Sequence, residues 1–248
     1  MQRDMSRRGF LGALGAVAAG SAAPTSPLAE ASESKPPAGG VKIVGISCSP
    51  RRGKTTATAL GICLRAAGLV DRRIETELID LGGLTIHGST GTKLPPPGTE
   101  PDDFDALASK LKDPAVRAIV IGSPVYFRTM SALCKSFIER CAALRVGGFA
   151  LANKAVGALA VGGYRNGGQE LVIEQIQAAL LCHEVFLVGG KPRAHQGATV
   201  WNIDNADEVL KDRVGMDSAQ KLGRRLAEAA LLLAGATGQA GPVKRGAT

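Results

Sequence analysis

The sequence has few aromatic side chains and no metal-ligand pattern. Aromatic residues make up 4% of the 248 residues, which disfavours an RNA-stacking surface or an aromatic-rich barrel. The 32 glycines and 13 prolines are too few and too irregular for collagen or long disorder. The five cysteines lie at positions 48, 63, 134, 141 and 182, without a C-x-x-C pair, and the three histidines are scattered. We therefore predict no metal site, and we expect Cys63, Cys134, Cys141 and Cys182 to be small core residues.

The remaining composition is that of a chain that buries a core. Hydrophobic residues make up 45% and charged residues 21%, with a formal net charge of +8. The basic residues are scattered, with pairs such as Arg51-Arg52 and Arg224-Arg225 rather than a continuous stripe. This distribution favours a solvated surface with one anion site over nucleic-acid binding, so no nucleic-acid partner is predicted.

The first 31 residues contain a targeting pattern. Ser6 to Leu11 is a twin-arginine motif in front of a short apolar run over 11–19, and Ala29-Glu30-Ala31 matches an A-x-A cleavage site. That run is shorter than the about 20 apolar residues that span a bilayer. We therefore predict a twin-arginine signal peptide over 1–31, export to the periplasm or the extracellular space, and no membrane anchor after cleavage. A cytosolic arm with two chance arginines is the alternative.

The rest of the chain divides into three parts. Residues 32–40 are rich in Ser, Pro and Gly and are predicted to be a linker. Residues 41–234 are predicted to form one compact domain. The Gly/Ala/Thr-rich residues 235–248 are predicted to be a disordered tail.

Short apolar runs alternate with helical patterns along the domain. Strands are expected over residues 41–46, 73–79, 115–122, 155–161 and 185–188, and helices over 55–67, 130–144, 167–181 and 216–233. This alternation predicts an α/β protein with a parallel sheet covered on both faces. Five strands fit the flavodoxin-like doubly wound fold, order 2-1-3-4-5. Ligands bind there at the carboxyl ends of the strands, where strands 1 and 3 meet.

The loop after the first strand, residues 47–56, suits a phosphate. It leads into the amino terminus of a helix, where backbone N–H groups and the helix dipole attract anions, and Arg51 adds a charged donor. Gly53-Lys54-Thr55 also resembles the end of a P-loop, so a P-loop NTPase is one alternative. Against it, Cys48 replaces the first glycine, Pro50 removes an N–H group, and no Asp ends the next core strand. A hydroxyl-rich helix cap without a ligand is the other alternative.

The loop after the third strand, residues 123–131, begins with a proline that ends the sheet. Tyr126 and Phe127 are costly to expose, so we expect them to line a pocket or a subunit contact. Ser131 or Thr129 can cap the helix that follows.

The loop after the fourth strand, residues 162–169, contains four glycines. They permit close approach of the backbone to a flat ligand, or tight turning alone. Asn166 and Gln169 have the spacing of a capping box.

These segments resemble a known family. Gly45–Arg51, Gly122–Phe127 and Ser131–Arg140 resemble the NAD(P)H-dependent FMN reductase family, and Gly162–Glu170 is similar to its iron–sulfur flavoprotein-like branch. The resemblance runs from about residue 42 to residue 227. It implies FMN as cofactor, and a homodimer or homotetramer with the flavin near a subunit boundary. The implied FMN-binding residues are Ser47, Ser49, Arg51, Thr55 and Thr56 for the phosphate, and Pro124, Val125, Tyr126, Phe127, Gly162, Gly163, Tyr164, Arg165 and Gly167 around the ring.

The chain departs from that family at two places. Cys48 stands where the family commonly has Gly, which crowds the phosphate turn unless its φ is negative. No cysteine lies between Leu81 and Asp103, where cluster-bearing relatives place theirs, so we predict no iron–sulfur cluster.

The resemblance implies an FMN-dependent oxidoreductase that passes electrons from NAD(P)H or another reduced donor to a quinone, a flavin or a similar acceptor. Tyr126, Tyr164 and Arg165 would shape the acceptor side. Since the flavin carries the chemistry, no catalytic acid or base is predicted. A non-enzymatic FMN electron carrier is the second alternative, and the positive charge argues mildly against it. Export also conflicts with NAD(P)H as donor, because this dinucleotide is not expected in quantity outside the cytoplasm.

Overall fold

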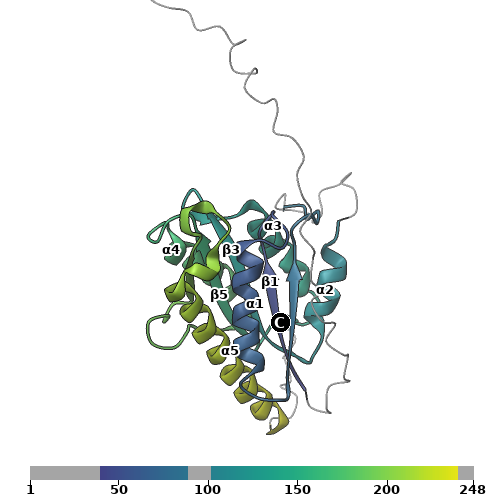
Figure 1. The fold of residues 1–248 in the computed structure, drawn as a ribbon. Helices are drawn as coiled ribbons and strands as arrows, with labels where there is room; N and C mark the ends of the chain where they lie inside the picture. The colour runs from purple at the N-terminus through teal and green to yellow at the C-terminus, as the bar shows by residue number, and fades with distance from the viewer. Residues whose placement is uncertain (1–39, 89–101, 240–248) are drawn as a thin grey trace, which may run out of the picture. The chain divides into compact units, whose positions relative to one another are not determined.

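A parallel sheet forms the centre of the protein in a computed structural model that describes residues 40–88 and 102–239. Its main strands are β1 (Val41–Ser47), β2 (Ile74–Asp80), β3 (Val116–Tyr126), β5 (Ala155–Gly162) and β6 (Phe186–Leu187). They lie in the order β2-β1-β3-β5-β6, and every pairing along this path is parallel (Figure 1). The predicted fold class and the order 2-1-3-4-5 are thus confirmed.

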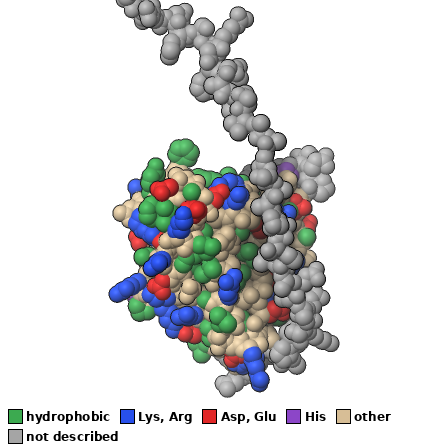
Figure 2. All heavy atoms as spheres, in the orientation of Figure 1, with side chains coloured by type: hydrophobic (Ala, Val, Ile, Leu, Met, Phe, Trp, Pro, Cys, Tyr) green, Lys and Arg blue, Asp and Glu red, His purple; other side chains and the backbone are tan. Residues whose placement is uncertain are grey.

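Helices cover both faces of the sheet. In Figure 1, α1 (Thr55–Gly68) and α5 (Arg213–Gln239) lie in front of the strands. One hydrophobic core cluster joins these two helices to the sheet. A second core cluster, on the other face, joins the sheet to α2 (Phe104–Lys112), α3 (Ala132–Arg140) and α4 (Gln169–Leu180). Both clusters are built from apolar side chains with almost no exposure, which is why the sequences of the central strands β1, β3 and β5 are largely apolar on both faces. Basic and acidic side chains are interspersed over the face in Figure 2.

The last position of the sheet is shared by two short strands. β6 pairs with the first half of β5, and β7 (Ala198–Trp201) pairs with the second half. The sequence predicts only one strand here, over residues 185–188. It does not predict β7, because the four residues of β7 are too few to show a periodic pattern. As a result β7, and not β6, reaches the carboxyl edge of the sheet, and the chain leaves it there at Asn202.

Three further differences concern local elements. α2 was not expected from the sequence, and α5 continues to Gln239, so the predicted boundary at residue 234 falls inside a helix. Cys63, Cys134 and Cys141 are buried as expected, but Cys182 is exposed because it follows the end of α4. The predicted signal peptide, nearly all of the linker, and residues 240–248 of the tail lie outside the described residues. Among those described, no helix has the length and apolar character needed to cross a membrane.

Candidate functional site

The strand register brings the three predicted loops to one edge of the sheet. Ser47, the last residue of β1, pairs with Asp80 on one side and with Gly122 on the other. β3 continues beyond this pairing to Tyr126, and Pro124 lies beside Val161 of β5. The carboxyl ends of β1, β3 and β5 therefore surround a common space.

The loop between β1 and α1, residues 48–54, is held by contacts from two directions. The Asp80 carboxylate accepts hydrogen bonds from the amides of Gly53, at 2.7 Å, and Gly82, at 3.1 Å. Ser131 Oγ donates to the carbonyl of Cys48 at 2.7 Å. Gly53 supplies the left-handed turn, with a φ of +68°, whereas Cys48 needs no positive φ and is fully buried. A cysteine is therefore compatible with this turn.

The amino terminus of α1 offers unfilled hydrogen-bonding capacity beside that loop. Its N-cap residue, Lys54, makes no side-chain cap, and its first turn contains no acidic residue. Four buried side-chain atoms in the described part of the chain lack a hydrogen-bond partner, and they include Ser47 Oγ and Thr56 Oγ1. Buried polar groups are rarely left unpaired, so hydroxyls without partners at a helix amino terminus fit a site for an anion.

The predicted loop after β3 is a short hairpin. β3 pairs antiparallel with β4 (Thr129–Met130), and the two turn residues, Phe127 and Arg128, have φ values of +50° and +64°. Two consecutive left-handed residues are typical of the two-residue turns that join the strands of a β-hairpin. The Phe127 side chain is fully exposed, and Tyr126 is 40% exposed. As expected, Ser131 caps α3 by accepting a hydrogen bond from the amide of Cys134.

The loop after β5 is organised by Gln169. Its amide group, which is 3% exposed, accepts a hydrogen bond from the amide of Gly167 and donates to the carbonyls of Tyr164 and Val200. Gly168 is the N-cap of α4 in a left-handed conformation, and it makes no side-chain cap. The capping box predicted from Asn166 and Gln169 is therefore wrong, because Gly168 is the N-cap. The Gln169 side chain instead orders the loop by bonding to the backbone of Tyr164 and Gly167.

A cavity of about 420 Å³ lies between these loops. Its lining combines one cation and a hydroxyl at the α1 end with apolar and aromatic side chains along β3 and β5. The lining residues are Arg51, Thr55, Pro124, Val125, Tyr126, Phe127, Arg128, Val161, Gly162, Gly163, Tyr164, Gly167, Asn202 and Asn205. The volume and the apolar walls are those of a small-molecule site.

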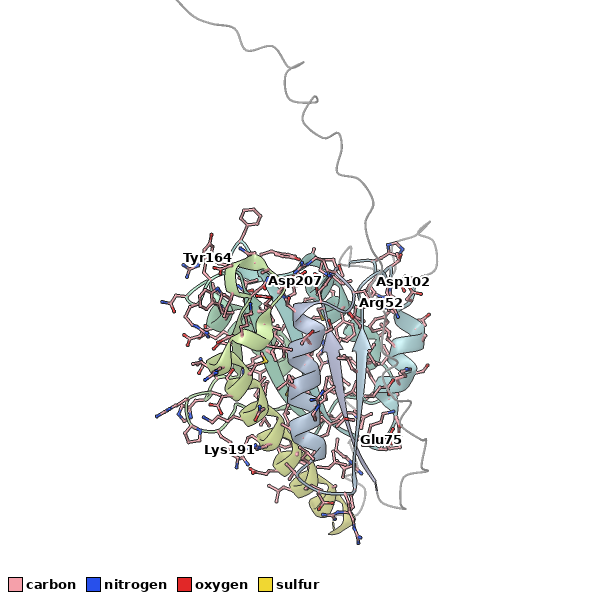
Figure 3. All side chains as sticks on the ribbon, in the orientation of Figure 1. Arg52, Glu75, Asp102, Tyr164, Lys191 and Asp207 are labelled. Carbon is pink, nitrogen blue, oxygen red and sulfur yellow. The ribbon has the colours of Figure 1, made fainter. Side chains whose placement is uncertain are left out.

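A segment after β7 closes the side of the cavity near α1. Residues 202–208, which we call the 202–208 segment, include Asn202 and Asn205 in the lining. Asp207 forms ion pairs with Arg51, at 2.9 Å, and with Lys54, at 3.5 Å. The hydrogen bond from Arg51 holds the pKa of Asp207 below its ordinary value. Figure 3 shows Asp207 beside the amino end of α1, and Tyr164 at the same edge of the sheet.

Most of the predicted site residues line the cavity, but four do not. Ser47, Ser49 and Thr56 are buried and are not among the lining residues, and Ser49 Oγ accepts a hydrogen bond from the amide of Arg51. Arg165 instead pairs with the buried Asp212 and lies over the ring of Trp201, with its guanidinium carbon 5.4 Å from the ring centre. Burial would raise the pKa of Asp212, but hydrogen bonds from Arg165 and two backbone amides lower it overall.

Sequence reasoning missed Arg128, Val161, Asn202, Asn205 and Asp207. The 202–208 segment has one detectable signal: four of the six residues from 202 to 207 are Asn or Asp, which tolerate left-handed conformations. Asp204, Asn205 and Asp207 adopt them, with φ values of +52°, +53° and +60°. The signal predicts a tight turn, but not which cavity it borders.

Comparisons with known proteins agree with this fold. The chain is 38% identical over 198 residues to an iron–sulfur flavoprotein of Methanocaldococcus jannaschii, covering 78% of this chain and 99% of the relative. It is 38% identical over 199 residues to an iron–sulfur flavoprotein of Archaeoglobus fulgidus, covering 75% and 95%. Among solved structures, RosB with a bound flavin intermediate superposes with a TM-score of 0.62 at 15% identity, covering 84% and 91%. An NADH:FMN oxidoreductase superposes at 0.53 with 19% identity, covering 77% and 89%.

The fold and these relatives define a flavodoxin-like flavoprotein oxidoreductase that uses FMN. Residues 41–198 match the NADPH-dependent FMN reductase family, and the chain belongs to it. The matched range contains the loops after β1, β3 and β5 but ends before Asn202. Membership in this family favours the flavoprotein interpretation over a P-loop NTPase.

The comparisons contradict the predicted export. The relatives are archaeal iron–sulfur flavoproteins, and almost their whole length aligns with this chain, without support for a periplasmic or extracellular protein. The prediction rested on an arginine pair and a short apolar run near the amino terminus. Such a local pattern is independent of the folded domain, and the assignment to the periplasm or the extracellular space is wrong.

Proposed function

We propose that the protein binds FMN in the cavity and transfers electrons from NAD(P)H or another reduced donor to a quinone, a flavin or a similar acceptor. The observation that carries this proposal is the position of the cavity. It joins the uncapped amino terminus of α1 to the apolar ends of β3 and β5. One end therefore suits a phosphate, and the other suits a flat ring system.

The residues at the α1 end fit a phosphate dianion. Arg51 and Thr55 line the cavity there, and Ser47 Oγ and Thr56 Oγ1 are the unpartnered buried hydroxyls next to them. Charge-assisted hydrogen bonds from an arginine and from helix amides are among the strongest that a protein offers to phosphate. We assign these residues, with Ser49 as the acceptor that orders the loop, to the cofactor phosphate.

The residues along β3 and β5 fit the ring. Pro124, Val125 and Val161 supply apolar walls, and Gly162 and Gly163 line the cavity beside them. Both positions favour glycine, because a Cβ would lie 2.5 Å from Gln169 Nε2 at Gly162 and 2.7 Å from Asn205 Oδ1 at Gly163. When bound, FMN supplies the hydride and electron chemistry, so the protein need only bind, orient and shield it. No acid or base is assigned. Tyr126 and Tyr164 flank the mouth, where donor and acceptor would approach.

The exposed aromatic side chains at the mouth of the cavity support the assembly of this chain into a homo-oligomer. Phe127 and Tyr164 are 102% and 74% exposed beside Tyr126, and exposed aromatic groups of this kind commonly mark contact surfaces. We assign this surface to the contact with a second copy of the chain, which would then border the cavity. Sedimentation equilibrium of the wild type and of Phe127→Ser tests this assignment, and an identical monomer mass for both proteins would refute it.

FMN binding is tested by titrating the purified apoprotein with FMN and riboflavin and following flavin fluorescence. We expect 1:1 binding of FMN and at least about tenfold weaker binding of riboflavin, because the phosphate contacts are charge-assisted. Thr55→Val should weaken FMN but not riboflavin. Thr58→Val is the matched control, because Thr58 lies one turn further along α1 and donates to the carbonyl of Lys54. Equal affinities for FMN and riboflavin would refute the phosphate assignment.

Turnover separates an enzyme from an electron carrier. The FMN-loaded protein is mixed anaerobically with NADPH, NADH or dithionite, and then with a quinone or free FMN. A rapid loss of flavin absorbance with NADPH or NADH, followed by multiple turnovers with an acceptor, supports a reductase. Reduction by dithionite but by neither dinucleotide supports a carrier. The same spectra test the prediction that the chain holds no iron–sulfur cluster, which would add absorbance beyond that of FMN. Within the described residues, no group of three His, Cys, Asp or Glu side chains could hold a metal.

A further inference from the structure

The Asp207 carboxylate lies at the same end of the cavity as the proposed phosphate contacts. Arg51 is both a cavity-lining residue and the ion-pair partner of Asp207, whose two oxygens lie 2.9 and 3.2 Å from Arg51 Nη1. Lys54, the N-cap residue of α1, contributes the second cation at 3.5 Å. The carboxylate therefore uses two of the three cations of the loop that precedes α1.

This ion pair connects segments that are far apart in the sequence. Asp207 follows Arg51 by 156 residues and is brought to it by β7, which ends beside Gly162. The 202–208 segment has few other attachments along its exposed part. Asn202 and Val209 are buried at its two ends, and the residues from 204 to 208 are exposed. Movement of Asp207 away from Arg51 would thus expose little additional core.

A carboxylate and a phosphate dianion repel each other when they approach the same cations. Two like charges at close range are unfavourable even in a partly solvated site, and both oxygens of Asp207 lie within hydrogen-bond distance of Arg51 Nη1, so a phosphate has to compete for that nitrogen. Both anions cannot hold Arg51 and Lys54 in full at once.

We infer that Asp207 is an internal competitor for the cofactor's phosphate: it occupies Arg51 and Lys54 in the free protein and must release them when a phosphate monoester binds. This inference rests on the proposed function for the identity of the natural ligand. The chemistry, however, requires only a small dianion such as inorganic phosphate. Asp207 then sets the affinity for the cofactor without contacting its ring.

The opposite role for Asp207 makes the opposite prediction. If the carboxylate served to position Arg51 for the phosphate, its removal would weaken binding. If it competes, removal tightens binding. The substitution Asp207→Asn removes the charge, keeps the shape, and is tolerated in the left-handed conformation that Asp207 adopts.

The experiment measures dissociation constants of full-length wild-type protein, Asp207→Asn and Asp204→Asn for FMN, riboflavin and inorganic phosphate. Asp204→Asn is the matched control, because it removes the same charge from the same segment in the same conformation. For Asp207→Asn we expect FMN and inorganic phosphate to bind about three- to tenfold more tightly, the range for losing competition from exposed ion pairs. Riboflavin should bind all three proteins equally, and the control should match the wild type.

The outcomes separate this inference from the proposed function. Unchanged or weaker binding of both FMN and phosphate to Asp207→Asn overturns the competitor role, even when the wild type binds FMN well. Tighter phosphate binding to Asp207→Asn, in a protein that binds no flavin, supports the competitor role and refutes the proposed cofactor. An equal gain in Asp204→Asn would mean that net charge alone is responsible, and would also overturn the inference.

Discussion

Lys154 should make the stability of this protein depend on alkaline pH. It precedes β5, is 7% exposed, and donates hydrogen bonds from Nζ to the carbonyls of Val116, at 2.6 Å, and Asp113, at 3.2 Å. Burial, with a smaller contribution from nearby Arg117, lowers its pKa from 10.5 to about 8. The folded protein therefore binds this proton less strongly than the unfolded chain does.

The direction of the effect follows from proton linkage. Below pH 8 the side chain is charged in both states, and the folded state carries the full cost of burying the charge. Between about pH 8 and 10.5 the unfolded chain holds more protons, so the free energy of unfolding rises with pH. The difference between the two pKa values corresponds to a gain of about 3 kcal/mol from this group once pH exceeds 10.5.

Urea unfolding of the wild type and of Lys154→Met between pH 7 and pH 10 isolates this contribution. The methionine does not titrate, so the stability of the wild type relative to Lys154→Met should increase by about 2.5 kcal/mol over this range. The control is Lys112→Met, because Lys112 is exposed in the last turn of α2 and its replacement should leave the pH dependence unchanged. A relative stability that stays constant between pH 7 and pH 10 would refute the reasoning.

Three further substitutions test local structure. Gln169→Ala should lower the free energy of unfolding by about 2–3 kcal/mol, because it leaves part-buried backbone groups of the loop after β5 and the buried carbonyl of Val200 without this partner, and it should also weaken FMN binding. Gly82→Ala should cost about 2–3 kcal/mol, because a Cβ there would lie 2.5 Å from the backbone of Arg52. Arg193→Asn should raise stability by about 0.5–1 kcal/mol, because the exposed Arg193 has a φ of +75°. Thermal or urea unfolding measures all three.

Each of these predictions has a control and a contradicting result. Glu170→Ala is next to Gln169 but removes only an exposed hydrogen bond, so an equal loss in both variants would count against the loop argument. Gly61→Ala places its Cβ in open space on α1, and it should be neutral or stabilising. Arg193→Ala keeps the unfavourable conformation, and a gain equal to that of Arg193→Asn would show that strain is not the cause.

Much of the fold could be predicted because its signals are local. The central strands are runs of apolar residues, the outer strand β2 alternates between apolar and polar residues, and each long helix shows periodic burial, so α1 and β2 were located to within a residue of their ends. Short elements without a period, such as β4 and β7, were missed, whereas β6 lies within the predicted strand over 185–188. The site was predicted in part for the same reason: Arg51, Thr55 and Tyr126 adjoin strand ends that are visible in the sequence.

The sequence by itself determined the alternation of strands and helices, and therefore a parallel sheet with loops at its carboxyl edge. Only the tertiary structure decided that Gln169 orders the loop after β5, that Arg165 pairs with Asp212, and that Asp207 reaches Arg51. These contacts join residues whose separation in the chain has no periodic signature. The last two exist because strand register, which sums many weak pairings, brings distant chain segments together.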